Sequence, residues 1–413
     1  MRRAHLVIVA SAVAMLGWGT VLPYQYAYAA TTRGWGGGVA ALSSSLFSVG
    51  ALAAAPIGGR LADRYSPALV AIIAKLAAAV AAASLILADT PATFLLGMSA
   101  FGFALAAAGP AQSVLVLRWV PSGDRRTVFA WLASGQALGM GIGAFVAGYL
   151  VDLHRTDGLV TAFATAGAGF AVSALLITLA ARGVNDLTSP PVTIPVERGD
   201  TVRALRGIAA APTLRWAAVI TIALALAFYA QFDSGLPAYA LTVLDVPART
   251  VGTAAAVNCL VIIALQMVVV RWTAERSSTG LLMVVAAIWL LCWVILAFAA
   301  HQPAMAATVF VTTFGIFAVG ETMYAPVLNP LVAQLAPAAF VGTTLGIFSA
   351  LQTGVSAVGP LIAGLALGAG RPMIFVGIHV AICAVAVAAG WRLHVLLRTR
   401  TTDPSPAEHA LRP

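Results

Sequence analysis

The chain has 413 residues, of which 61% are hydrophobic and only 9% are charged, and its mean hydropathy is +0.96. A water-soluble domain usually carries about 25% charged residues, so this composition excludes an ordinary soluble protein. The formal net charge of +9 would suit a nucleic-acid-binding protein, but the placement of the basic residues argues against that class.

Twelve long apolar segments follow one another, each close to the ~20 residues that cross a bilayer as a helix. They lie at about 5–30, 40–59, 67–89, 91–118, 126–150, 158–181, 214–241, 247–270, 279–299, 304–334, 339–368 and 371–397. The predicted domains are an N-terminal six-helix bundle at 1–181, a cytoplasmic linker at 182–213, a C-terminal six-helix bundle at 214–398 and a cytoplasmic tail at 399–413.

The two sets of six segments align on each other. An offset of 216 pairs Pro110 with Pro326 and Gln136 with Gln352, and an offset of 214 pairs Leu22-Pro23 with Leu236-Pro237. Repeats of six spans typify transporters, whose substrate sites lie between the two halves. We therefore expect an all-α integral membrane fold with twelve transmembrane helices in two pseudo-symmetric bundles around a central cavity.

Basic residues indicate the orientation in the membrane. By these boundaries 18 of the 23 lysine and arginine residues lie on one side of the spans, whereas Arg33, Arg155, Arg249 and Arg371 lie on the other. Cytoplasmic loops carry the excess of positive charge. We expect a multi-pass protein of a bacterial cytoplasmic (inner) membrane with both termini cytoplasmic.

Two acidic residues, Asp233 and Glu321, lie well inside predicted spans, and the corresponding positions of the first half hold Gly19 and Leu105. An ionisable residue at membrane depth normally faces a cavity and has a function. Lys75 is the only basic residue within a span, and it lies in the other half, so a buried ion pair is the less favoured interpretation. We expect Glu321 and Asp233 to couple proton movement, with the proton as the coupling ion and no cofactor.

Polar and aromatic residues in the spans are candidates for the lining of a substrate cavity. They are Tyr24, Gln25, Gln112 and Gln136 in the first half and Tyr229, Gln231, Asn258, Tyr324 and Asn329 in the second. The alternative for each one is a hydrogen bond between helices, which is the commoner role of such residues in a membrane bundle.

The loop between the second and third spans reads Gly58-Gly59-Arg60-Leu61-Ala62-Asp63-Arg64. It resembles the cytoplasmic loop signature of the major facilitator superfamily, through Gly59, Asp63 and Arg64. That resemblance implies a conformational latch in which the Asp packs against a helix end and basic residues pair with carboxylates. Asp124, in the next cytoplasmic loop, is the candidate partner of Arg64. The alternative is a solvated loop pair that contributes little.

Small residues in spans five and eleven indicate close helix packing. The pattern Gly139-x-x-x-Gly143-Ala144-x-x-Ala147-Gly148 and its mate Gly359-Pro360-x-x-Ala363-Gly364 resemble the antiporter signature of this superfamily, although Ala144 stands where the signature has its proline. Together with Asp233 and Glu321, these segments resemble the twelve-span bacterial drug:proton antiporters. The resemblance implies proton-coupled export of amphiphilic, cationic or lipophilic small molecules.

Motifs of enzymes and metal sites do not occur in the sequence. It contains no P-loop, no HExxH, no Gly-x-Ser-x-Gly elbow and no metal-binding spacing around Cys259, Cys292 and Cys383. We expect a monomeric, non-enzymatic transporter that contacts a small-molecule substrate and membrane lipids, and no nucleic acid. Two alternatives stay open: a proton-coupled importer or exporter of one sugar or amino acid, and a non-transporting membrane receptor on the same scaffold.

Overall fold

The computed structural model describes residues 2–121, 124–182, 206–207, 210–232, 234–273, 276–337 and 341–402. Within these residues the secondary structure is entirely helical. Eleven of the described helical segments are long and apolar enough to cross a membrane. The glycine-rich α6 (Arg125–Leu150) is 26 residues long and falls outside that set. The predicted all-α membrane fold is confirmed.

The first bundle contains the helices up to residue 181. They are α1 (Arg2–Val21), α2 (Gln25–Ala27), η1 (Tyr28–Thr32), α3 (Gly36–Arg64), α4 (Pro67–Ser84), η2 (Leu85–Leu87), α5 (Pro91–Trp119), α6 (Arg125–Leu150) and α7 (Val160–Ala181). Helix α1 packs against α6 and α7, and α3 and α4 pack against α5.

The second bundle begins at Pro212. Its elements are α9 (Pro212–Leu224), η3 (Ala225–Tyr229), α10 (Ala230–Phe232), α11 (Gly235–Thr242), α12 (Ala248–Thr273), α13 (Ser278–Ala299), η4 (Pro303–Met305), α14 (Ala306–Leu335), α15 (Val341–Gly368) and α16 (Pro372–Thr402). Helix α14 packs against α12 and α13, and α16 packs against α13 and α9. Most of the linker, and the tail from residue 403, lie outside the described residues.

Helix starts are set by local sequence. Ser66 accepts a hydrogen bond from the backbone N–H of Leu69 and precedes Pro67, which is the first residue of α4. Thr90 and Thr93 form a capping box ahead of α5, which also begins with a proline. Such caps satisfy backbone N–H groups that a helix end leaves without partners, and proline suits the first helical position.

The first span of each bundle is interrupted. The regular α1 helix ends at Val21, just before Pro23, and the seventh span changes to a π-helix at Ala225–Tyr229 before α11 begins at Gly235. The indole N–H of Trp293 donates to the carbonyl oxygen of Ala227 at 2.8 Å, which satisfies a polar group inside this irregular turn. Irregular backbone inside a membrane protein is tolerated where it is buried in protein or lines a cavity.

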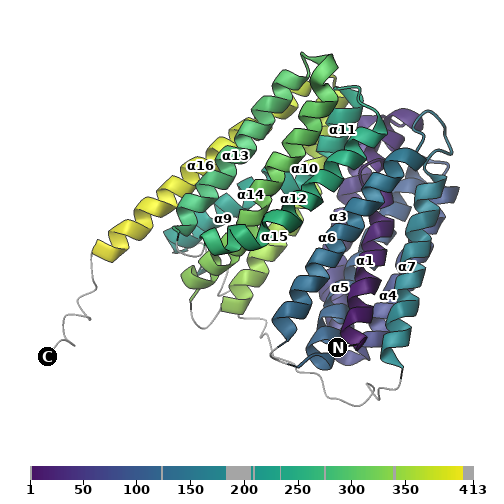
Figure 1. Ribbon diagram of the computed structural model, residues 1–413, viewed down its shortest axis with the longest axis horizontal. Helices are drawn as coiled ribbons and strands as arrows, with labels where there is room; N and C mark the ends of the chain where they lie inside the picture. Colours follow the sequence, from purple (N-terminus) through teal and green to yellow (C-terminus); the bar gives the residue numbers. More distant parts are fainter. Residues whose placement is uncertain are drawn as a thin grey trace.

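The two bundles approach each other at one end and spread apart toward the other, where the N-terminus and the end of α16 lie (Figure 1). Helix α3 packs against α15 and α6 against α12. A Cβ added at Gly37 would lie 2.9 Å from the Cα of Gly368, and one added at Gly148 would lie 2.9 Å from the Cα of Arg249. We call this end, away from the chain termini, the closed end.

Candidate functional site

A cavity of about 190 Å³ lies between the two bundles. Residues of α6 and the break after α1 form its first wall, and η3, α10, α11, α12 and α14 form the second. The lining residues are Leu22, Pro23, Ala137, Met140, Gly141, Ala144, Tyr229, Phe232, Pro237, Val251, Ala255, Asn258, Cys259, Ile262, Phe314 and Glu321. We refer to it as the central cavity.

Glu321 supplies the acidic group of the central cavity. Its side chain is partly exposed, and its Oε2 accepts a hydrogen bond from Nδ2 of Asn258 at 3.3 Å. The same amide nitrogen lies 3.4 Å from the carbonyl oxygen of Phe314. Within the described part of the chain no lysine or arginine forms an ion pair with Glu321. The carboxyl group can therefore exchange a proton or face a cationic ligand without displacing a fixed cation.

Aromatic side chains share the wall of the central cavity with this carboxyl group or pack behind it. The rings of Tyr229 and Tyr324 lie 5.3 Å apart, and Trp289 lies 6.0 Å and 5.9 Å from them. The indole N–H of Trp289 donates to the carbonyl oxygen of Phe317 at 3.1 Å, and the hydroxyl of Tyr324 accepts from Nε2 of Gln352 at 2.9 Å. Ring faces beside a carboxylate suit flat or cationic organic groups.

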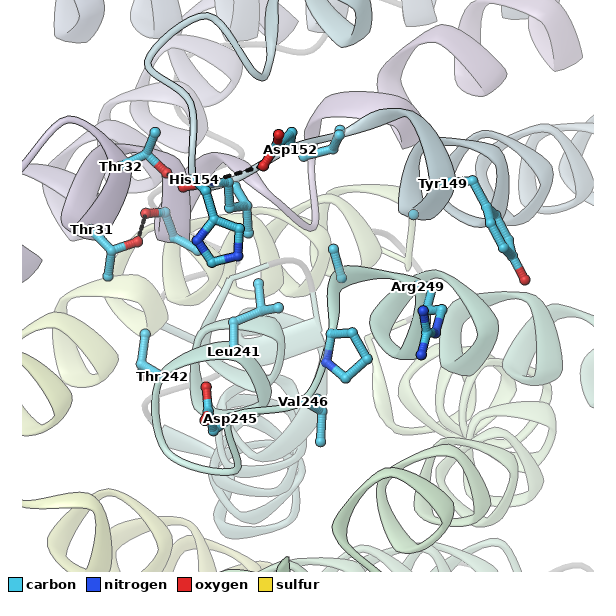
Figure 2. A pocket seen from close by; sticks show the side chains of 16 residues that line it. Thr31, Thr32, Tyr149, Asp152, His154, Leu241, Thr242, Asp245, Val246 and Arg249 are labelled. Carbon is cyan, nitrogen blue, oxygen red and sulfur yellow. Dashed lines mark hydrogen bonds between the residues drawn. The ribbon is translucent and has the colours of Figure 1, made fainter.

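A second, larger cavity of about 850 Å³ opens at the closed end. Thr31, Asp152 and His154 line it from the first bundle, and Asp245 and Arg249 line it from the second (Figure 2). All five side chains are exposed. Exposed charges interact weakly with one another and with ligands because water screens them. The central cavity is therefore the stronger candidate for the functional site.

Several predicted lining residues bond to neighbouring helices. The Tyr24 hydroxyl donates to the carbonyl oxygen of Ala144 at 2.9 Å and lies 3.3 Å from that of Ala248, so it bridges the bundles at the closed end. The side-chain amides of Gln25, Gln112 and Gln231 donate to Ser44, Ser11 and the carbonyl oxygen of Gly359, respectively. The structure places these four side chains in helix contacts, away from the central cavity lining.

The other predicted residues divide into lining and non-lining positions. Tyr229 and Asn258 line the central cavity, while Tyr324 is buried against Tyr229. Gln136 is partly buried next to the lining residue Ala137, and Asn329 is exposed on α14. Asp233, the second predicted acid, lies outside the described residues.

The predicted packing residues lie at four different contacts, two within a bundle and two between the bundles. Added Cβ atoms at Gly139 and Gly143 would collide with the α1 backbone at Ala12 and Leu16, so these glycines join α6 to α1 within one bundle. Gly148 contacts Arg249 across the two bundles.

On the other side of the molecule, Gly359 packs against Ala230 of α10, and Gly364 packs against Ala41 of α3. Pro360 lies buried inside α15, beside Gly359. Gly364 thus joins the bundles, as Gly148 does, whereas Gly359 acts within the second bundle.

The predicted latch falls largely outside the described part of the structure. The backbone of α3 reaches Arg64, but the side-chain surroundings of Gly59, Asp63 and Arg64 are not among the described residues. Asp124 is exposed and directly precedes α6. The proposed pairing of Arg64 with Asp124 stays a prediction.

Apolar residues of the site were not predicted from the sequence. Met140, Cys259 and Phe314 line the central cavity, and Trp289 packs behind it. In a span that is apolar on every side, periodicity does not distinguish a residue that faces a cavity from one that faces lipid. The one usable signal was proximity in sequence, since Cys259 follows Asn258 directly.

Comparisons with known proteins agree with this architecture. A POT family transporter in complex with 5-aminolevulinic acid matches with a TM-score of 0.76 and 12% identity, covering 95% of this chain and 96% of that one. The nucleoside transporter NupG matches at 0.75 and 13%, covering 96% and 99%. A bacterial homologue of the human lysosomal transporter Spinster, inward-facing and unoccupied, matches at 0.73 and 14%, covering 98% of both chains.

At these identities the structural neighbours show the fold alone. Comparison with curated protein sequences gives no significant match. The family model described as Major Facilitator Superfamily matches residues 7–360, which is most of the chain. The chain therefore belongs to the major facilitator superfamily of secondary transporters.

Proposed function

We propose that this transporter exports amphiphilic small molecules in exchange for protons, with Glu321 as the coupling carboxyl group. The observation that carries the proposal is the position of Glu321 on the wall of the central cavity, hydrogen-bonded to Asn258 and beside aromatic rings. A proton and a cationic or lipophilic substrate would compete for this one place, and such competition is sufficient for exchange.

The arrangement of the bundles supports a transport cycle that starts from this conformation. If the termini are cytoplasmic, as the distribution of basic residues predicts, the spread end faces the cytoplasm. Substrate would enter from that side or from the inner leaflet and displace the proton of Glu321. Opening of the closed end would then release the substrate outward and allow protonation from outside. Asp233 is the proposed second carrier, and the Asp63–Arg64 loop would bias the outward-open state.

The direct test is ethidium transport by purified protein in proteoliposomes under an imposed pH gradient, comparing the wild type with Glu321→Gln. Glutamine keeps the shape and hydrogen-bonding capacity of the side chain but cannot release a proton. The proposal predicts gradient-driven transport by the wild type and none by the variant. Equal gradient-driven transport by both proteins would leave an exporter in place and remove Glu321 from the mechanism.

A second candidate is a proton-coupled transporter of one specific metabolite. It is favoured by the fold neighbours, which are described as peptide and nucleoside transporters. Uptake assays that scan peptides, nucleosides, sugars and amino acids distinguish the two candidates. Saturable transport of one of these classes without movement of ethidium would replace the export proposal.

A further inference from the structure

An apolar groove runs along the outside of α6 and α12, where the two bundles meet. Its volume is about 280 Å³, and its lining residues are Leu138, Gly141, Ile142, Phe145, Ala256, Cys259 and Leu260. Four of these side chains are large, apolar and well exposed, at 39–61% of their surface. In a membrane bundle such a surface faces lipid, so we call this feature the lipid-side groove.

The lipid-side groove and the central cavity share two wall residues, Gly141 and Cys259. On α12, Asn258 faces the central cavity, Cys259 lies at the boundary, and Leu260 faces the groove. The wall between bilayer and cavity is therefore one residue thick on this helix.

The same order of positions occurs on α6. Met140 lines the central cavity, Gly141 lies at the boundary, and Ile142 lines the groove. Each helix contributes one residue to the boundary between the groove and the central cavity. These residues are Gly141, which has no side chain, and Cys259, which faces it.

The Cys259 thiol closes this boundary. It donates to the carbonyl oxygen of Ala137 at 3.2 Å, and a Cβ added at Gly141 would lie 2.6 Å from its sulfur. Nearer the closed end, by contrast, Gly252 and Gly148 bring α6 and α12 into backbone contact. Those contacts join backbone to backbone, whereas the boundary at Gly141 is closed by the Sγ and Cβ atoms of one small side chain, which lie 2.6 Å and 3.0 Å from the added Cβ.

We propose that Gly141 and Cys259 form a lateral portal through which the apolar part of a substrate passes between the bilayer and the central cavity. The groove offers only apolar side chains and a thiol, while the cavity offers Glu321 and Asn258. An apolar groove that leads to a polar cavity fits an amphiphile whose chain or ring lies in the portal and whose polar head lies at Glu321. The inference rests on the proposed export function.

The test uses a phospholipid with a photoactivatable diazirine near the end of one acyl chain, reconstituted with the full chain in vesicles. Peptide mass spectrometry then compares adducts at Phe232 and Glu321, in the central cavity, with adducts at Leu260, in the groove. Gly141→Leu should lower the ratio of cavity adducts to groove adducts by about tenfold, because the larger side chain blocks the boundary between Gly141 and Cys259. Gly377→Leu is the matched control, since Gly377 is exposed on α16 with no atom within 4 Å of an added Cβ.

Cys259→Ala provides an opposite change that does not depend on the folding of the leucine variant. Removal of the thiol widens the boundary, so the cavity adducts should increase relative to those at Leu260. A wild-type protein labelled only in the groove would overturn the portal, as would cavity labelling that neither Gly141→Leu nor Cys259→Ala alters.

Ethidium transport in the same vesicles separates the two proposals. Portal-dependent labelling without gradient-driven ethidium transport would support the portal and contradict the export function. Gradient-driven transport without cavity labelling would contradict the portal and leave the export function standing.

Discussion

The two bundles share one helical plan, but different side chains fill the space behind their cavity-facing helices. In the first bundle α4 packs against α5 and α7 largely through small residues, among them the buried Ala71, Ala78 and Ala82. In the second bundle the matching helix, α13, contributes Trp289 and Trp293, both fully buried. Small residues allow close approach of helices, whereas tryptophans add ring surface and an N–H group that needs a partner.

The ionisable groups within the spans of the two bundles differ as well. Lys75 lies in the interior of the first bundle, 5.3 Å from the centre of the Phe170 ring and away from the central cavity lining. Glu321 of the second bundle faces the central cavity, and the sequence repeat pairs it with Leu105. The comparison teaches that two halves with one fold can have different interiors, with small residues and a lysine away from the cavity in one and tryptophans and a cavity-facing carboxyl group in the other.

Moving the acid between the bundles should have the largest effect. The double variant Leu105→Glu, Glu321→Leu keeps the number of acids in the spans but moves one of them away from Asn258 and the rings of Tyr229 and Tyr324. We expect gradient-driven ethidium transport to fall to the level of vesicles without protein, while Leu105→Gln alone keeps most of it. Recovery of coupled transport in the double variant would show that the bundles are interchangeable.

Removal of a tryptophan should expose the difference in packing. Trp289→Ala deletes ring contacts and removes the indole N–H that donates to the carbonyl oxygen of Phe317, and a buried change of this kind costs about 3–5 kcal/mol. Thermal unfolding in detergent measures the loss. The exposed Trp391, on α16 of the same bundle, is the control, and equal stability losses for both substitutions would contradict the packing difference.

The closed end depends on groups from both bundles, and Tyr24→Phe tests one of them, the hydroxyl that bridges Ala144 and Ala248. Loss of its hydrogen bonds to Ala144 and Ala248 removes about 1 kcal/mol, which shifts the conformational equilibrium about fivefold toward separation at that end. Distances between spin labels at Thr31 and Thr242 report the shift. Tyr28→Phe is the control because its hydroxyl bonds within one bundle, to Thr156, and a similar shift in that variant would discount the bridge.

Substitution of Lys75 should have the smallest effect on transport. Lys75→Met keeps the length of the side chain and removes a buried charge, an exchange that is often neutral for stability. We expect gradient-driven transport to stay within about twofold of the wild type, since Lys75 does not line the central cavity. A complete loss of transport in a folded variant would mean that the first bundle also carries coupling chemistry.

The architecture could be predicted from the sequence because each membrane span appears there as a long apolar segment and the two bundles appear as a repeat. The apolar segments located the spans, and the pairing of Pro110 with Pro326 indicated the repeat. Glu321 could also be identified from the sequence as a candidate site residue, since an isolated acid in an apolar span has few structural explanations. The resemblance to drug antiporters predicted the superfamily correctly, while the fold neighbours include structures described as a peptide transporter and a nucleoside transporter.

The contacts of individual polar residues were not predictable in this way. Tyr24 and Gln231 are residue types that often line cavities. Their hydrogen-bond partners, however, are set by the rotation of each helix and by how closely the bundles approach. The lipid-side groove depends on the register between Gly141 and Cys259, which lie 118 positions apart in the chain. Such registers arise from packing between helices, and no local pattern in the sequence encodes them.

The central claim is that a proton and the substrate compete at Glu321. Proton release on addition of ethidium to purified protein in weakly buffered detergent solution measures that competition directly. We predict release by the wild type near neutral pH and none by Glu321→Gln, with ethidium binding to both proteins confirmed by fluorescence. Equal proton release by the two proteins would contradict the account.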